Sequence, residues 1–204
     1  PSELSFSKDE IHISKFEIAS GEQNIRVSGN TSRTRKDTLS LEMDRFNLSI
    51  LNPLIKSDLR IKGAVTGKVM LTSPMESKGL LADLICDSTY VADVPLGVLN
   101  VGSSWDEDFE RFNISVQNSH EGRRNIDIQG KLTPKLKTIE ADIKLDDMNI
   151  GYVQPILYDV FSDMQGTISG DIMIDGPLSG FDISSRGTRL NDALLKVAYT
   201  NVPY

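Results

Sequence analysis

Two glycine-rich stretches are the first candidates for chemistry in this sequence. GAVTGKVMLTSPM runs from Gly63 to Met75, and GTISGDIMIDGPL runs from Gly166 to Leu178. A glycine-rich loop cradles a phosphate when a Lys-Ser or Lys-Thr pair and the start of a helix follow the glycines. Neither stretch is followed by such a pair or by a helical pattern. Because glycine within a strand marks a bulge, a bend or a close backbone approach, we expect each stretch to be a strand that bends at its glycines.

Histidine and cysteine, the usual zinc ligands, are scarce and scattered. His12 falls on the polar phase of an alternating segment and His120 falls in a turn-like one. Neither has a second ligand at zinc-site spacing, so we expect both to be exposed to solvent and no zinc site to form. The single cysteine, Cys86, cannot form an internal disulfide. Its apolar neighbours predict a small buried side chain.

Acidic residues cluster at Asp106-Glu107-Asp108 with Glu110, and at Asp146-Asp147. A calcium loop needs oxygen ligands at alternating positions, a central glycine and a terminal glutamate, and neither cluster supplies these. The serine-containing loop 102–105 lacks the G-x-S-x-G elbow of a hydrolase nucleophile. No carboxylate stands in an apolar sequence environment that would raise its pKa. We therefore predict that the chain is not an enzyme and holds no metal or cofactor.

The composition excludes further classes of function. Of 204 residues, 39% are hydrophobic and 25% are charged, which is typical of a folded protein. The net charge of −7 is unfavourable for binding the phosphates of nucleic acid. Aromatic residues make up only 6%, so the apolar content is mainly Ile, Leu and Val, which favour strands. No apolar run is long enough to span a membrane, and we expect the chain to be a piece of a longer protein.

The glycine-rich stretches belong to a longer internal repeat. EIHIS in the first half matches RFNIS in the second, NIRVSG matches NIDIQG, and DRFNL matches DDMNI. These features follow one another in the same order in both halves. We therefore predict two copies of one β unit of about 100 residues each, with residues 1–102 as the first and residues 103–204 as the second, continuous with it.

Within each unit, apolar and polar residues alternate with a period of two. Successive side chains of a strand point to opposite faces, so the predicted sheet has one apolar and one polar face. Turn-forming residues at Ser20-Gly21-Glu22, Gly29-Asn30-Thr31, Ser73-Pro74, Thr133-Pro134 and Asp175-Gly176-Pro177 predict an antiparallel meander. The residues predicted to line the apolar face are Ile11, Ile13, Ile25, Val27, Leu39, Leu41, Met43, Val69, Leu71, Ile126, Ile128, Ile139, Ile143, Ile172, Ile174, Leu195 and Val197.

One element in each unit departs from this period. Its apolar residues follow the spacing of one helix face, and a proline, Pro53 or Pro155, stands near its start, where a missing N–H is tolerated. We expect one short amphipathic helix of about two turns before each glycine-rich strand. The apolar positions are Leu51, Leu54, Ile55 and Leu59 in the first unit, and Val153, Ile156, Leu157, Val160 and Phe161 in the second.

The apolar sheet face must be buried, and two architectures achieve this. Each unit could close into its own β-sandwich, or one antiparallel sheet could run through both units and curl into an elongated, taco-shaped apolar groove. We favour the second: a mainly β fold built from two repeats. Rows of Ile, Leu and Val suit an acyl chain, because each buried methylene contributes about 0.8 kcal/mol.

The second unit resembles the TamB proteins of the AsmA-like superfamily. Its short helix is followed by a strand of the pattern G-x-[IV]-[ST]-G-x-[IV]-x-[ILV]-x-G-P-[LM], and then by an L-x-x-A-x-[ILV]-x-V-x-Y strand. The first unit matches more loosely, with Ser73 in place of the usual glycine. The second pattern is filled here by Leu190, Ala193, Leu195, Val197 and Tyr199.

The resemblance implies a lipid-handling role. TamB-like proteins are periplasmic bridges of Gram-negative bacteria, anchored in the inner membrane. They are linked to phospholipid transport between the two membranes, and to outer-membrane biogenesis with a TamA-type barrel partner that other parts of the parent protein would contact. We expect this chain to shield lipid acyl chains, although the client of its groove could equally be an unfolded β-strand. The alternative is a tandem β-sandwich adhesion or carbohydrate-binding module of a surface protein.

Overall fold

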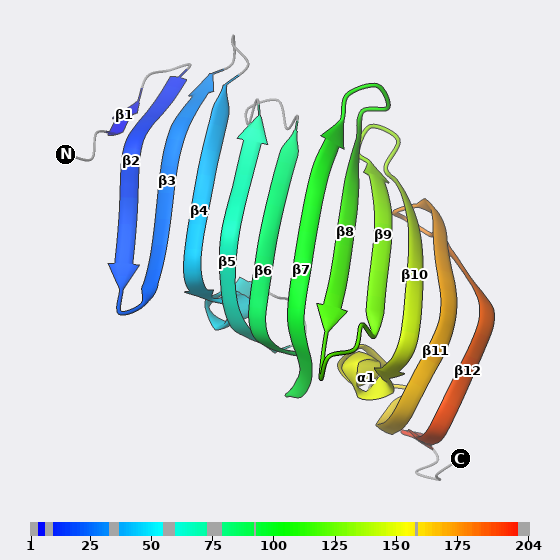
Figure 1. Cartoon of the computed structure of the whole chain (residues 1–204). Helices are drawn as coiled ribbons and strands as arrows, with labels where there is room; N and C mark the ends of the chain where they lie inside the picture. Colours follow the sequence, from blue (N-terminus) through cyan, green and yellow to red (C-terminus); the bar gives the residue numbers. More distant parts are fainter. Residues whose placement is uncertain are drawn as a thin grey trace.

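A computed structural model of the chain describes residues 4–6, 10–32, 37–54, 60–72, 79–91, 93–157 and 159–199. These residues form a twelve-stranded sheet in which each strand pairs antiparallel with the next one along the chain. Figure 1 shows the strands side by side in chain order, with β1 and β12 at opposite edges. The strands are β1 (Leu4–Phe6), β2 (Glu10–Ser20), β3 (Gln23–Ser32), β4 (Thr38–Asn47), β5 (Ile61–Thr72), β6 (Leu80–Val91), β7 (Val94–Asp106), β8 (Arg111–Ser119), β9 (Ile126–Thr133), β10 (Thr138–Asn149), β11 (Phe161–Pro177) and β12 (Asp182–Val197).

The sheet is open and runs without a break through both halves of the sequence. The predicted division at residue 102 lies inside β7, which pairs with β6 on one side and β8 on the other. The prediction of one elongated antiparallel sheet is therefore confirmed. Two separately closed sandwiches do not occur among the described residues, because all of their strands belong to one sheet.

Short helical segments precede β5 and β11, as the sequence predicts. They are η1 (Leu48–Leu54), η3 (Ile150–Val153) and α1 (Gln154–Leu157), and Figure 1 shows α1 at the lower end of the sheet. The second helical element is shorter than predicted, because Val160 lies in a turn and Phe161 begins β11. In the first element the prediction of a proline near the start is wrong, because Pro53 is the last residue but one of η1. Ile55 and Leu59 lie outside the described residues. No helix within the described ranges is long and apolar enough to cross a membrane.

Two of the predicted turns are confirmed, at residues 21–22 and 134–137. The turn predicted at Asp175-Gly176-Pro177 is wrong, because these residues end β11 and pair with β10, and the turn begins only at residue 178. The turn predicted at Gly29-Asn30-Thr31 is wrong, because these residues belong to β3 and pair with β2. The alternation of side chains between the two faces of the sheet continues through these residues. It determines their conformation, although the residue types are ones that favour turns. Ser73-Pro74 lies outside the described residues.

Bulges recur at matching places in the two halves of the sheet. Arg45 in β4 and Asp147 in β10 both have positive φ, 51° and 47°, and the register with the following strand shifts at both. The backbone N–H of Arg45 donates to the hydroxyl of Thr66 at 3.1 Å. That of Asp147 donates to the hydroxyl of Ser169 at 2.9 Å. The fourth residue of each glycine-rich stretch therefore holds the bulge of the preceding strand.

The first glycine of each stretch faces a second bulge, in the following strand. These bulges lie at Ser88 in β6 and Asp192 in β12, with φ of 50° and 46°. A Cβ on Gly63 would lie 3.0 Å from a backbone carbonyl oxygen of β6, and one on Gly166 would lie 2.6 Å from one of β12. A side chain at either position would displace the neighbouring backbone. The repeated stretch is therefore a strand held between two bulges, as its glycines predict.

The fully buried core is small and lies near the helical end of the sheet. Its apolar cluster consists of Leu96, Leu145, Met148 and Tyr152. The Tyr152 hydroxyl donates to the carbonyl oxygen of Pro95 at 2.6 Å. Asn118, only 1% exposed, accepts from the N–H groups of Asn125 (2.9 Å) and Ile126 (2.6 Å) and donates to the carbonyl of Leu96. Both the amide oxygen and the amide nitrogen of the buried Asn118 side chain therefore have hydrogen-bond partners, as a stable core requires.

Candidate functional site: the apolar face of the sheet

The residues predicted to line a groove all lie on one face of the sheet. Cross-strand partners share a face, and residues two apart along a strand share it as well. One row crosses ten strands from β2 to β11 through Ile18, Ile25, Met43, Gly67, Leu84, Val101, Val116, Ile128, Ile143 and Ile172. The adjacent row on the same face runs through Phe16, Val27, Leu41, Val69, Ala82, Ser103, Ile114, Gly130, Ala141, Ile174 and Ile183.

The remaining predicted residues continue the same face above and below these rows. Leu39 and Leu71 pair with each other, and Ile13 pairs with Gly29. Ile126 pairs with the buried Leu145. At the far edge, Leu195 pairs with Met164 and Val197 with Phe161. Ile11 and Ile139 extend the pattern by one alternation in β2 and β10.

The predicted lining residues are half-buried, and none of them belongs to the fully buried core. Neighbouring side chains shield one another, but the described residues provide no second sheet to cover them. Exposure rises toward the flanks of the sheet, where Ile18 is 53% and Ile183 65% exposed. Contiguous apolar surface of this kind marks a site of interaction with another apolar body.

One end of the apolar face is closed by the protein itself. Tyr152, presented by η3 (Ile150–Val153), packs with Leu96, Leu145 and Met148. The Asn149 side chain caps η3 by accepting from the N–H of Gly151 at 2.8 Å. Of the predicted lining residues, Ile126, Ile143 and Ile172 pack against this cluster. The apolar surface therefore remains open only away from this end.

Sequence reasoning missed the aromatic part of the face. Trp105 and Phe112 form an edge-to-face pair with ring centroids 4.6 Å apart. They share a row with Leu132 and Ile139. The alternation from Leu99 to Trp105 in β7 carries the signal that would have found them, but the internal repeat is weakest over this strand.

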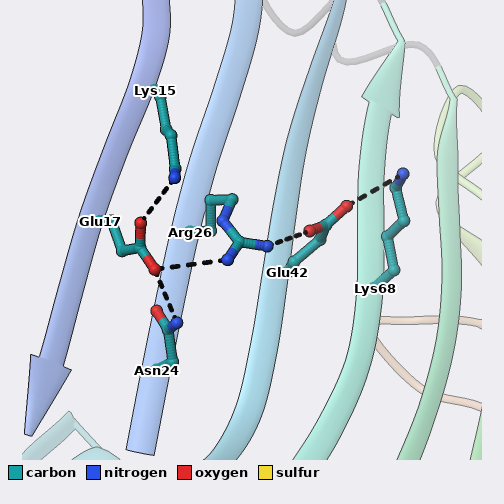
Figure 2. Close-up of polar contacts among 6 residues, drawn as sticks. All are labelled: Lys15, Glu17, Asn24, Arg26, Glu42 and Lys68. Atoms are coloured by element: carbon teal, nitrogen blue, oxygen red, sulfur yellow. Dashed lines mark hydrogen bonds and ion pairs between the residues drawn. The ribbon is translucent and has the colours of Figure 1, made fainter. Parts of the chain in front are cut away.

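The opposite face carries a chain of alternating charges that Figure 2 shows. Glu17, Arg26, Glu42 and Lys68 are consecutive cross-strand partners in β2 to β5. Arg26 lies 3.3 Å from Glu17 and 3.0 Å from Glu42. Lys68 lies 3.4 Å from Glu42, and Lys15 lies 2.9 Å from Glu17. These ion pairs contribute little stability in water. Their charged side chains favour contact with solvent, however, and so determine which face of the sheet is polar and which is apolar.

The charge chain changes the proton affinities of its members. Hydrogen bonds from Lys15 and then Asn24 lower the pKa of Glu17 from 4.5 to about 2. The hydrogen bond with Arg26 lowers the pKa of Glu42, and the same contact raises the pKa of Arg26. Both carboxylates are therefore charged across the neutral and mildly acidic range.

Residues that could carry other chemistry do not come together. The described ranges contain no group of three His, Cys, Asp or Glu side chains placed to hold a metal. His12 bonds to the side chain of Asn30, and both histidines are half-buried, so the expectation of full exposure is wrong. Cys86 is buried, as predicted, and desolvation raises the pKa of its thiol, which disfavours the reactive thiolate.

The apolar face of the sheet is therefore the candidate functional site. It can hold an apolar chain along the strands or across them, and its charged reverse side can face water at the same time. No family model matches the chain, and neither curated proteins nor solved structures provide a match.

Proposed function

We propose that this chain is a segment of a TamB/AsmA-like protein that shields lipid acyl chains on the apolar face of its sheet. The observation that carries the proposal is the succession of mainly apolar cross-strand partners from β2 to β11, half-buried or exposed and without a covering sheet among the described residues. A face built to be filled by the protein's own core would bury these side chains, as the cluster around Tyr152 does.

The dimensions suit an acyl chain. β5 has 12 residues, so at about 3.3 Å per residue it spans roughly 40 Å. Each methylene removed from water contributes about 0.8 kcal/mol, and the face offers Ile, Leu and Val along that whole length. Few polar side chains interrupt the apolar face. The small residues Gly67, Ser103 and Gly130 make its surface lower at their positions and add no charge.

The polar reverse face supports a water-filled compartment as the setting. Under this proposal the compartment is the periplasm, and the parent protein is anchored in the inner membrane. The segment would support phospholipid transport between inner and outer membranes and outer-membrane biogenesis. A TamA-type barrel partner would bind other parts of the parent protein. These statements rest on the resemblance of the stretch Gly166–Leu178 and its flanks, and the proposal assigns no catalytic residue.

Lipid mass spectrometry of protein purified without detergent tests the proposal. We expect co-purifying phospholipid, and we expect Val69→Arg to lower the lipid-to-protein ratio at least about tenfold, because a guanidinium in the apolar row is costly to desolvate. Met70→Arg is the matched control. Met70 is the next residue of β5, on the opposite face, where its partner in β4 is Ser40, so this variant should keep its lipid.

Three results would count against acyl-chain shielding. The first is absence of lipid from the unmodified chain under detergent-free conditions. The second is equal lipid loss in Val69→Arg and Met70→Arg. The third is unfolding of Val69→Arg alone by circular dichroism, which would identify Val69 as ordinary core.

A further inference from the structure

Three turns at one end of the sheet carry large apolar side chains that are exposed to solvent. These turns join β7 to β8, β9 to β10 and β11 to β12, and Figure 1 shows them at the end of the sheet opposite α1. The exposed fractions of the four side chains lie between 45% and 69%, and the residues are Phe109, Leu136, Leu178 and Phe181. An exposed apolar group of this kind indicates an interaction surface.

Contacts between the three turns hold them side by side. The ammonium of Lys135 in the second turn lies 3.2 Å from the carboxylate of Glu110 in the first. The backbone N–H of Leu178 in the third turn donates to the carbonyl oxygen of Lys137 in the second at 2.7 Å. Alternate turns of a meander are two strand spacings apart, about 10 Å. The four apolar residues therefore form a row of roughly 20 Å, named the apolar rim below.

The first turn is also fixed internally. The Asp106 carboxylate accepts a hydrogen bond from the backbone N–H of Phe109 and another from the guanidinium of Arg111, both at 3.3 Å. The same guanidinium lies over the Phe109 ring, 4.3 Å from its centroid. These contacts keep the Phe109 ring in an exposed position at the tip of the hairpin.

The apolar face of the sheet extends as far as the rim. Its last row before the turns consists of Trp105, Phe112, Leu132 and Ile139. Trp105 is the last residue but one of β7, and Phe112 is the second residue of β8. The opposite end of the face is closed by the cluster around Tyr152. An acyl chain that enters or leaves the face along the strands therefore passes the rim.

The charges of the three turns nearly cancel. Residues 106–111, 134–137 and 178–181 contain three basic residues, Arg111, Lys135 and Lys137, and four acidic residues, Asp106, Glu107, Asp108 and Glu110. Arg111 pairs with Asp106, and Lys135 pairs with Glu110. A strongly charged surface gains little from such a partner, because attraction to anionic lipid needs clustered basic residues. The apolar side chains must therefore supply the binding energy.

The arrangement of the apolar side chains favours a fluid partner. They stand on separate turns, with charged residues between them. A protein partner would need a matching pocket for each side chain, whereas the interface of a bilayer takes up each one separately, and its binding strength follows the apolar area that is buried.

We propose that the apolar rim rests on the surface of a phospholipid bilayer and inserts its Phe and Leu side chains at the level of the headgroups. This inference rests on the proposed function, because a face that shields acyl chains must receive them from a bilayer. With the rim in the interface, the open end of the apolar face lies against the bilayer. An acyl chain then passes between bilayer and sheet with little exposure to water.

Flotation of the full chain with phosphatidylcholine vesicles tests the proposal. We expect the unmodified chain to float with the vesicles, and we expect Phe109→Ser/Leu136→Ser to lower the bound fraction at least about tenfold, because two large apolar side chains no longer leave water. The matched control is Ile50→Ser/Val160→Ser, which removes side chains 58% and 51% exposed near the helical segments. This control should float like the unmodified chain. All four residues are exposed, so both variants should fold, and circular dichroism checks this.

Three results would overturn the bilayer proposal. The first is no flotation of the unmodified chain, or equal loss in the two double variants. The second is at least about tenfold tighter binding to phosphatidylglycerol vesicles, because binding would then follow charge and not the apolar rim. The third comes from sedimentation: if the unmodified chain self-associates and Phe109→Ser/Leu136→Ser is monomeric, the rim is an interface between two copies.

Val69→Arg distinguishes this proposal from acyl-chain shielding. Val69 lies on the apolar face in β5, outside the rim, so the variant should lose its co-purifying lipid and still float with vesicles. Lipid that co-purifies with a chain that does not float would overturn only the rim proposal. Flotation of a chain that carries no lipid would overturn only acyl-chain shielding.

Discussion

Substitution of Gly67 by alanine should destabilise the sheet far more than substitution of Gly21 or Gly130, which have room for a Cβ. Gly67, in β5, has a φ of 145°, and a Cβ placed on it would lie 2.1 Å from the carbonyl oxygen of Asp83 in β6. Ordinary van der Waals contact begins at 3.4 Å. The two backbones would therefore have to separate by more than 1 Å at a point where β5 and β6 pair on both sides.

The magnitude follows from two costs. A non-glycine residue in this region of φ costs about 1–3 kcal/mol, and overpacking of a site that cannot relax typically costs a further 1–3 kcal/mol. We expect Gly67→Ala to lower the free energy of unfolding by roughly 3–5 kcal/mol.

Two other glycines provide matched controls. Gly130 also lies on the apolar face, but its φ is not positive and a Cβ would meet atoms only at 3.7 Å and beyond, so Gly130→Ala should change stability by less than about 0.5 kcal/mol. Gly21 has a φ of 59° with open space around it, so Gly21→Ala should cost only the backbone term of about 1 kcal/mol. Urea unfolding followed by circular dichroism gives all three values. If Gly67→Ala were no worse than Gly21→Ala, the close approach of β5 and β6 would be wrong.

Three further predictions concern the polar contacts that shape the sheet. Asn118→Ala leaves two backbone N–H groups and one carbonyl without their partner and should cost about 3 kcal/mol in urea unfolding; a loss below that of a surface substitution would contradict the buried network. Ser169→Ala removes the acceptor for the N–H of Asp147 and should cost about 1 kcal/mol, whereas Ser169→Thr keeps the hydroxyl and should cost less. The pKa of Glu17 falls from 4.5 to about 2 on folding, so its contribution to stability is present above pH 4.5 and is lost as the pH falls toward 2. Glu17→Gln should flatten the pH dependence of unfolding in that window, and an unchanged profile would contradict the Lys15 contact.

The faces of the sheet could be predicted from the sequence because a period of two leaves no choice of register. A shift by one residue would move Ile128 and Ile143 to the charged face. The repeat also predicted the succession of strands, because equivalent residues make equivalent contacts in both halves. Thr66 and Ser169, for example, each accept the backbone N–H of the bulge residue in the preceding strand.

What could not be predicted depends on contacts between strands. The bulges at Arg45 and Asp147 carry no residue type that requires positive φ. They form because a hydroxyl on the adjacent strand, that of Thr66 or Ser169, accepts their N–H. The turn expected at Gly29 is a strand because β2 pairs along it. Trp105 was missed because β7 has no strong counterpart in the first half.

Quenching of Trp105 fluorescence tests the central claim most directly. Trp105 is the single tryptophan of the chain and lies on the apolar face beside Phe112, so its emission reports on that face alone. A long-chain fatty acid labelled with bromine on its tail should quench it saturably, and a short-chain brominated acid at the same concentration should not. Val69→Arg should weaken the quenching, and Met70→Arg should leave it unchanged. Equal quenching by the long and short acids, or none by either, would contradict an apolar face that is open to acyl chains.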